Sequence, residues 1–358
     1  MTAVFCHNAS DRSAETWQQQ LVRFEYLDFA ISDAAKGIES AVAQINRHRR
    51  EHDPTAPRLV HGLDLFHTTQ EAQRVLSQKW RRAELLWEGA EDCDVGVKRA
   101  KAQGIDARGP ACTARTAWSK ATEAFEEVDR LQAGWRRCRG AFELFRPDGR
   151  LNDRDWAESE IQAGLSELTS PEWRKVRNFL TDSRSLAFLD RLHERLEMAE
   201  PRAEWREVLA WRWWRLRNPC SSPATSPLAA MAYAVAAHRP LNGIEQAAYN
   251  RIGAILNDTV RASSAVECMN SVLRMQQARH RRMTQPMLDL KRLYWNCHRF
   301  RSGPRKNQCP YQALGVGLPT YDFWQRLQRN PDELTQELST PRIAARGNLI
   351  RCICISST

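Results

Sequence analysis

The spacing of apolar residues divides the chain into a mixed N-terminal part and a long helical part. Short apolar runs predict three strands, at 3–6, 27–33 and 58–66. Helical spacing between these runs predicts two helices, at 13–23 and 34–50. This β-α-β-α-β order is typical of a partly parallel sheet in an α/β protein.

The strand pattern disappears from residue 68 to about residue 257, and helical spacing replaces it. Six helices are predicted there, at 70–103, 111–143, 156–168, 171–180, 185–200 and 205–217. Eleven of the 13 tryptophans fall between Trp80 and Trp295, and we expect most of them to pack in a core. A Pro-rich segment at 219–227 predicts a long loop or linker.

These patterns predict an α-rich α/β fold in which a large all-helical insertion interrupts a small sheet domain. We place the first part of the sheet domain at 1–80, and the helical insertion at 81–257. The sheet domain resumes with a basic helical part at 258–330, and 331–358 are expected to form an irregular C-terminal tail.

Composition indicates a soluble globular protein, with 42% hydrophobic and 27% charged residues. No apolar run approaches the roughly 18 residues that a membrane-spanning helix needs. The N-terminus lacks the basic start and long apolar stretch of a signal peptide. We therefore expect a cytoplasmic protein with no membrane partner.

Positive charge is concentrated in one stretch. The chain carries a net charge of +10, and the 46 residues from Arg261 to Lys306 contain eleven Lys and Arg against two acids. This stretch predicts a surface that follows a DNA backbone, although a solvated basic face with no partner is the alternative. The candidate phosphate contacts are Arg274, Arg281, Lys291, Arg292, Arg299 and Arg305.

Three acids are candidates for chemistry, and each has a structural alternative. Asp33 ends a predicted strand, where α/β sheets place functional groups, but it could cap the next helix. Glu267 is an isolated acid in the basic stretch, but it could form a capping box with Ser264 or a salt bridge. Asp64 and His67 flank the end of the next strand, where Asp64 could face an edge and His67 could cap a helix.

Five segments together carry a resemblance to a known family, at 31–38, 63–67, 263–271, 293–300 and 303–315. Over roughly residues 10–330 the chain resembles the acidic-triad, or DDE-type, transposases of bacterial insertion sequences. The resemblance implies a ribonuclease-H-like fold, with Asp33 as the second acid and Glu267 as the last. In that chemistry two Mg²⁺ or Mn²⁺ ions support DNA cleavage and strand transfer at transposon ends and target DNA. Asp64 and His67 would be accessory residues, and self-association stays open.

One departure from the family affects the expected activity. The family places its first Asp on the first strand of the sheet, whereas the apolar run at 3–6 contains no acid. The expected N-terminal DNA-recognition region is also missing, so the sequence predicts an N-terminally truncated and catalytically impaired transposase. A non-catalytic protein that binds DNA through residues 261–306 is the alternative. A helical interaction protein whose acids only cap helices is a third interpretation.

Overall fold

The computed structural model describes residues 13–22, 27–32, 35–218, 238–259, 284–301, 306–313, 318–330 and 352–355. The chain divides into two compact units: a sheet unit, residues 1–64 with 262–358, and a helical unit, residues 65–261. The sequence interpretation placed the first boundary after residue 80. The observed boundary is earlier because one continuous helix, α3, runs from Leu65 to Ala102 and leaves no break near residue 80.

The sheet unit contains a parallel sheet with the strand order β2-β1-β3. Strand β1 is Phe29–Ser32, and it pairs in register with β2, Val60–Leu63. A parallel pair needs a crossover connection, and helix α2, Lys36–His52, supplies it. Strand β2 is shorter than the predicted run at 58–66 because α3 begins only two residues after Leu63. The run at 3–6 lies outside the described residues.

The third strand was not foreseen from the sequence. Residues 331–358 were expected to be an irregular tail, but Cys352–Ile355 form β3 and pair with β1 in parallel. The register places Cys352 beside Phe29 and Ile355 beside Ser32. The partner strand stands at the opposite end of the chain, so no local pattern around residue 352 could reveal this pairing.

Helices α1, Ala14–Leu21, and α2 build the core of the sheet unit with β1. The helix predicted at 34–50 is confirmed as α2, and its apolar residues Ile38, Val42 and Ile45, which recur at helical spacing, are all buried in this core. Asn46 then fixes α2 to the chain that enters β2. Its side-chain amide donates to the Leu59 carbonyl at 2.9 Å and accepts from the Leu59 N–H at 2.8 Å.

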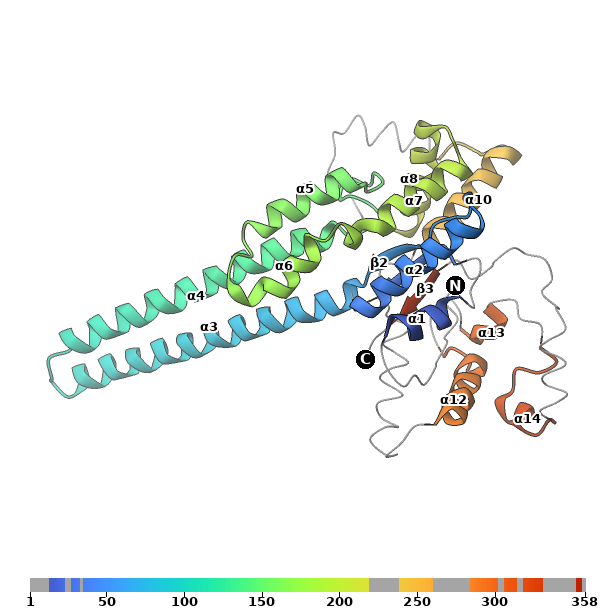
Figure 1. The fold of residues 1–358 in the computed structure, drawn as a ribbon. Coiled ribbons are helices and arrows are strands. Elements are labelled where there is room, and N and C mark those ends of the chain that lie inside the picture. Colours follow the sequence, from blue (N-terminus) through green and yellow to red (C-terminus); the bar gives the residue numbers. More distant parts are fainter. Residues whose placement is uncertain are drawn as a thin grey trace. The chain divides into compact units, whose positions relative to one another are not determined.

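The helical unit is dominated by an antiparallel hairpin of α3 and α4, Arg108–Gly140, which run side by side in Figure 1. The predictions of two long helices here are confirmed. Small buried residues at seven-residue spacing, Ala83 with Ala90 and Ala114 with Ala121, form the seam and allow the two helices to approach closely.

Shorter helices complete the helical unit, and the four helices predicted between residues 156 and 217 are also confirmed, whereas the helix Gly243–Asp258 was not predicted. These shorter helices are α5 (Arg154–Leu165), η1 (Pro171–Trp173), α6 (Arg174–Leu180), η2 (Ser183–Leu186), α7 (Ala187–Ala199), α8 (Ala203–Arg217) and α10 (Gly243–Asp258). Figure 1 shows α5 lying along α4. The two helices meet at Gly134 and Gly164, where an added Cβ on Gly164 would lie 2.6 Å from the Gly134 carbonyl oxygen. The expectation that most tryptophans pack in a core is confirmed only in part, because Trp135, Trp173 and Trp211 are buried whereas Trp80 and Trp87 are exposed.

The described part of the C-terminal segment of the sheet unit adds three helices: α12 (Gln285–Cys297), α13 (Pro310–Ala313) and α14 (Phe323–Leu327). The described chain is therefore a helix-rich α/β protein with a small parallel sheet, as the coarse fold prediction stated.

Candidate functional site

At the edge of the sheet where β1 and β2 end, the backbone pairing of the two strands continues to Asp64. The Asp64 N–H donates to the Ser32 carbonyl at 2.8 Å, which extends the ladder one step beyond the last paired residues, Ser32 and Leu63. Asp33 follows Ser32 in the sequence, but it lies outside the described residues. The carboxyl edge of a parallel sheet is the usual place for ligands and catalytic groups. Candidate acids were expected from the sequence at the ends of two strands for this reason. The parallel β1–β2 register shows that the two strands end at the same edge of the sheet.

Asp64 is 2% exposed, which is rare for a carboxylate. A buried carboxylate needs hydrogen bonds or a cation to offset the loss of its hydration. Of the three strands described, β1 and β2 are each followed directly by an Asp, whereas Ser356 follows β3. Strand β3 therefore adds no carboxylate next to its own C-terminal end.

Two buried polar side chains are hydrogen-bonded to each other next to this edge, one on β1 and one on β2. This pair was not predicted from the sequence. Ser32 Oγ and His61 Nε2 share a hydrogen bond of 2.7 Å, which joins the side chains of β1 and β2. Ser32 is fully buried and His61 nearly so. A polar pair in the interior is stable only when its members are hydrogen-bonded. The one available signal was a histidine inside the apolar run of the second predicted parallel strand.

His67, predicted as an accessory residue with Asp64, lies in the first turn of α3. Its ring is half-buried and packs edge-to-face on Phe66, with the ring centroids 5.6 Å apart. This contact does not show whether His67 caps the helix. The proposed accessory role stays a prediction.

The basic stretch is described in part. Glu267, Arg274, Arg281 and Arg305 lie outside the described residues, so their predicted roles stay predictions. Lys291 and Arg292 are on α12, and Arg299 follows it as an exposed residue. Arg292 pairs with Asp289 one turn earlier, at 3.2 Å.

Lys291 and Arg299 differ from Arg292 in their charge pairing. Neither forms an ion pair with any residue in the part of the chain that the structure describes. Lys291 is half-buried and Arg299 is exposed, and a cation that forms no ion pair keeps its charge available for an anionic ligand. These two residues are therefore the best described candidates for phosphate contacts.

Two titratable side chains near α12 are shifted by their surroundings. Burial raises the pKa of the Cys297 thiol, and the positive charge of Arg326 opposes this shift. Burial also raises the pKa of the Tyr311 hydroxyl, which shares a hydrogen bond with Asn296. Both groups are therefore neutral at physiological pH and do not offset the positive charge of this segment.

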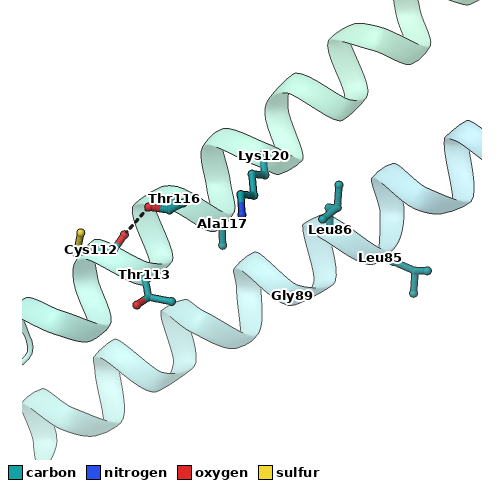
Figure 2. Close-up of a pocket in the computed structure, with 8 residues that line it drawn as sticks. All are labelled: Leu85, Leu86, Gly89, Cys112, Thr113, Thr116, Ala117 and Lys120. Carbon is teal, nitrogen blue, oxygen red and sulfur yellow. Dashed lines mark hydrogen bonds between the residues drawn. The ribbon is translucent and has the colours of Figure 1, made fainter. Parts of the chain in front are cut away.

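The helical unit offers a different kind of surface. A hollow of about 420 Å³ lies on the α3–α4 hairpin, where Gly89 and Ala117 leave space between the helices. Figure 2 shows Leu86 on α3 and Ala117 and Lys120 on α4 pointing toward the opposite helix. Its lining includes one charged side chain, Lys120, and no carboxylate or histidine. Cys112 and Lys120 are its two titratable lining side chains, which are too few for a metal site of several ligands.

The described residues contain no cluster of three or more His, Cys, Asp or Glu side chains placed to hold a metal ion. Both predicted metal ligands, Asp33 and Glu267, lie outside the described ranges, so their distance from each other is not tested. No helix within those ranges is both long enough and apolar enough to cross a membrane.

Comparisons of this protein with protein families, with curated proteins and with solved structures found no match.

Proposed function

We propose that this chain is a DNA-mobility protein of the acidic-triad transposase type, built on a ribonuclease-H-like sheet. Its reaction would be metal-dependent cleavage of a phosphodiester bond followed by strand transfer. The observation that carries the proposal is the parallel β1–β2 register, in which the Asp64 N–H is bonded to the residue directly before Asp33. Two acids thus follow neighbouring strands at the edge where α/β sheets place their sites.

Carboxylates in such an arrangement favour a cation. Two unit charges about 4 Å apart repel by roughly 4 kcal/mol at an effective dielectric near 20, and a divalent ion removes this penalty. Mg²⁺ prefers carboxylate oxygens and retains some of its own waters. When bound, such ions activate an attacking water or hydroxyl and stabilise the leaving oxygen. Asp33 and Glu267 would be the principal ligands. Asp64 is a third candidate, because it directly follows β2, the strand that pairs with β1.

The DNA would be held by the basic stretch. Lys291 and Arg299 have no ion pair among the described residues, so both can neutralise phosphates. Arg274, Arg281 and Arg305 would continue the same surface. Backbone contacts of this kind position DNA without reading its sequence.

A calorimetric titration with Mn²⁺ tests the cation site. The wild-type chain and the variants Asp33→Asn, Asp64→Asn and Glu267→Gln are compared, with Glu123→Gln on the helical hairpin as the matched control. We expect binding in the wild type and in the control, and at least a tenfold loss for Asp33→Asn and for Glu267→Gln. Equal binding by all five proteins would contradict the assignment.

DNA binding measured in the same proteins separates this proposal from a non-catalytic role. If the acid variants lose Mn²⁺ but the wild type shows no Mn²⁺-dependent strand cleavage, the chain binds the metal without completing the reaction. If Mn²⁺ never binds but DNA does, the non-catalytic DNA-binding alternative is correct.

A further inference from the structure

A hollow of about 270 Å³ lies between the C-terminal end of α12 and the segment that begins α14. Four rings of Tyr, Phe and Trp line it, contributed by Tyr294, Tyr321, Phe323 and Trp324, together with the imidazole of His298. All of these residues belong to the sheet unit, and none was singled out for chemistry by the sequence patterns. The hollow thus joins two segments that are separated by about 20 residues of sequence.

The rings are arranged around open space and do not form a closed core. Phe323 contacts both neighbours edge-to-face, with centroid distances of 5.1 Å to Tyr294 and 5.1 Å to Trp324. Trp324 is nevertheless 68% exposed, and Tyr294 is 46% exposed. In the helical unit, by contrast, Trp173 is fully buried. Exposed rings held by other rings form a platform on which a flat ligand can stack.

The polar groups of the hollow fit a ligand with both a flat ring and a negative charge. Arg299 lines the hollow, is exposed, and has no ion pair with any described residue. Asp322 also lines the hollow, and one of its carboxylate oxygens caps α14 by accepting from the Gln325 N–H at 2.9 Å. A carboxylate oxygen can accept a hydrogen bond from an N–H group of a base, such as the N3–H of thymine.

A buried cation also lies close to the hollow, although it is not one of the lining residues. Arg326 on α14 is only 2% exposed, and its Nε donates to the Thr320 carbonyl at 2.7 Å. Its Nη2 has no hydrogen-bond partner among the described residues. A buried guanidinium with an unsatisfied nitrogen raises the local positive potential. Its charge acts on Cys297, which lines the hollow.

We propose that this hollow binds one unstacked base of single-stranded DNA. The base stacks on Trp324 and Tyr294, and the adjacent phosphate contacts Arg299. The inference rests on the proposed function in one respect, namely that DNA is the ligand of the chain. It does not depend on the metal site, because stacking and phosphate contacts need no divalent ion.

Binding of oligothymidylate to the full chain tests the proposal, with EDTA present so that failure of the metal site cannot affect the result. Stacking of a base on an aromatic side chain contributes about 1–3 kcal/mol, so we expect Trp324→Ala to weaken binding by about tenfold. Trp324→Phe should retain most of the affinity because it keeps an aromatic face. Duplex DNA of the same length should bind Trp324→Ala and the wild type equally. Trp80→Ala, which removes a partly exposed tryptophan of the helical unit, is the matched control.

Photocrosslinking gives a readout that does not depend on folding of a variant. Oligothymidylate that carries one 5-iodouracil is irradiated with the wild-type chain, and the crosslinked peptide is identified by mass spectrometry. Crosslinks at Trp324, Tyr294 or Phe323 support the proposal. Crosslinks confined to other segments would overturn it, and so would an equal loss of single-stranded and duplex binding in Trp324→Ala.

Discussion

The helical unit and the sheet unit use their charged side chains in different ways. In the helical unit, some cations are paired with acids on other helices: Lys79 lies 2.9 Å from Glu127, and Arg137 lies 2.7 Å from Glu160. In the sheet unit, Lys291 and Arg299 have no such partner among the described residues. The paired cations fix helices to one another, whereas the charge of Lys291 and Arg299 stays open to a ligand. We therefore propose that the DNA contacts lie in the sheet unit.

The largest expected effect is on the free energy of unfolding, and it should distinguish a buried tryptophan of the helical unit from an exposed tryptophan of the sheet unit. Trp173→Ala removes a fully buried side chain of the helical unit and should cost about 3–5 kcal/mol of unfolding free energy. Trp324→Ala removes a mostly exposed one from the sheet unit and should change stability by no more than about 0.5 kcal/mol. Urea denaturation followed by circular dichroism measures both. Similar losses in the two variants would show that the exposed rings belong to a core.

The next largest effect should come from Lys291 and Arg299, which have no ion pair among the described residues. Their substitution should weaken DNA binding and leave the stability of the protein unchanged. If about six phosphates are neutralised, log K should fall with log salt at a slope near −5. Replacing Lys291 and Arg299 together by Ala should flatten that slope by about two. Arg281→Ala should flatten it by about one, with little change in sequence preference. The measurement is a DNA affinity series across salt concentrations.

The control for the salt series is Arg137→Ala, whose guanidinium is already paired with Glu160. It should leave the slope unchanged. A slope that is insensitive to the double variant, or variants that lose sequence discrimination and keep the slope, would remove the case for backbone contacts.

Two Gly→Ala substitutions in the helical unit should change the stability of the protein in opposite directions, by smaller amounts. An added Cβ at Gly164 would lie 2.4 Å from the Cys138 sulfur, so Gly164→Ala should destabilise the protein by about 1–3 kcal/mol. Gly96 on α3 has no atom within 4 Å of an added Cβ, so Gly96→Ala should stabilise the helix by about 0.5–1 kcal/mol. Thermal unfolding of both variants checks the signs. A gain of stability for Gly164→Ala would mean that α4 and α5 do not approach closely at this point.

Two glutamates of the helical unit should give the smallest effects, with opposite dependence on pH. Burial raises the pKa of Glu207, so its ionised form costs stability once the pH rises through that value. The hydrogen bond from Arg202 lowers the pKa of Glu200, so its contribution is present at neutral pH and is lost as the pH falls through the lowered pKa. Glu207→Gln should therefore raise the unfolding temperature at pH 7, and Glu200→Gln should lower it. Both differences should shrink near pH 4, and a shift of the same sign in both variants would contradict these assignments.

The sequence predicted the helical unit well because its information is local. Seven-residue spacing of small residues, such as Ala83 with Ala90, is visible within one helix and also defines the seam of the α3–α4 hairpin. Helical spacing at 34–50 likewise predicted α2, whose buried face carries Ile38 and Val42. The unit boundary placed at residue 80 fell inside the helix predicted at 70–103, because local spacing identifies a helix but not the unit to which it belongs.

The sheet unit was predicted less completely because its contacts are distant in sequence. The β1–β3 pairing joins Phe29 with Cys352, and no periodicity links these positions. The bond between Ser32 and His61 likewise depends on the register of two strands. Candidate acids could be found from their positions at strand ends, whereas the aromatic hollow between α12 and α14 required the tertiary fold.

A diffraction experiment on crystals grown with Mn²⁺ tests the central claim most directly, because anomalous scattering locates the ion and the carboxylates around it. The account predicts Mn²⁺ at the carboxyl edge of β1 and β2, with the Asp33 and Glu267 carboxylates within about 8 Å of each other, a span that a metal pair can bridge. Carboxylates of Asp33 and Glu267 on opposite faces of the sheet, with no Mn²⁺ between them, would contradict it.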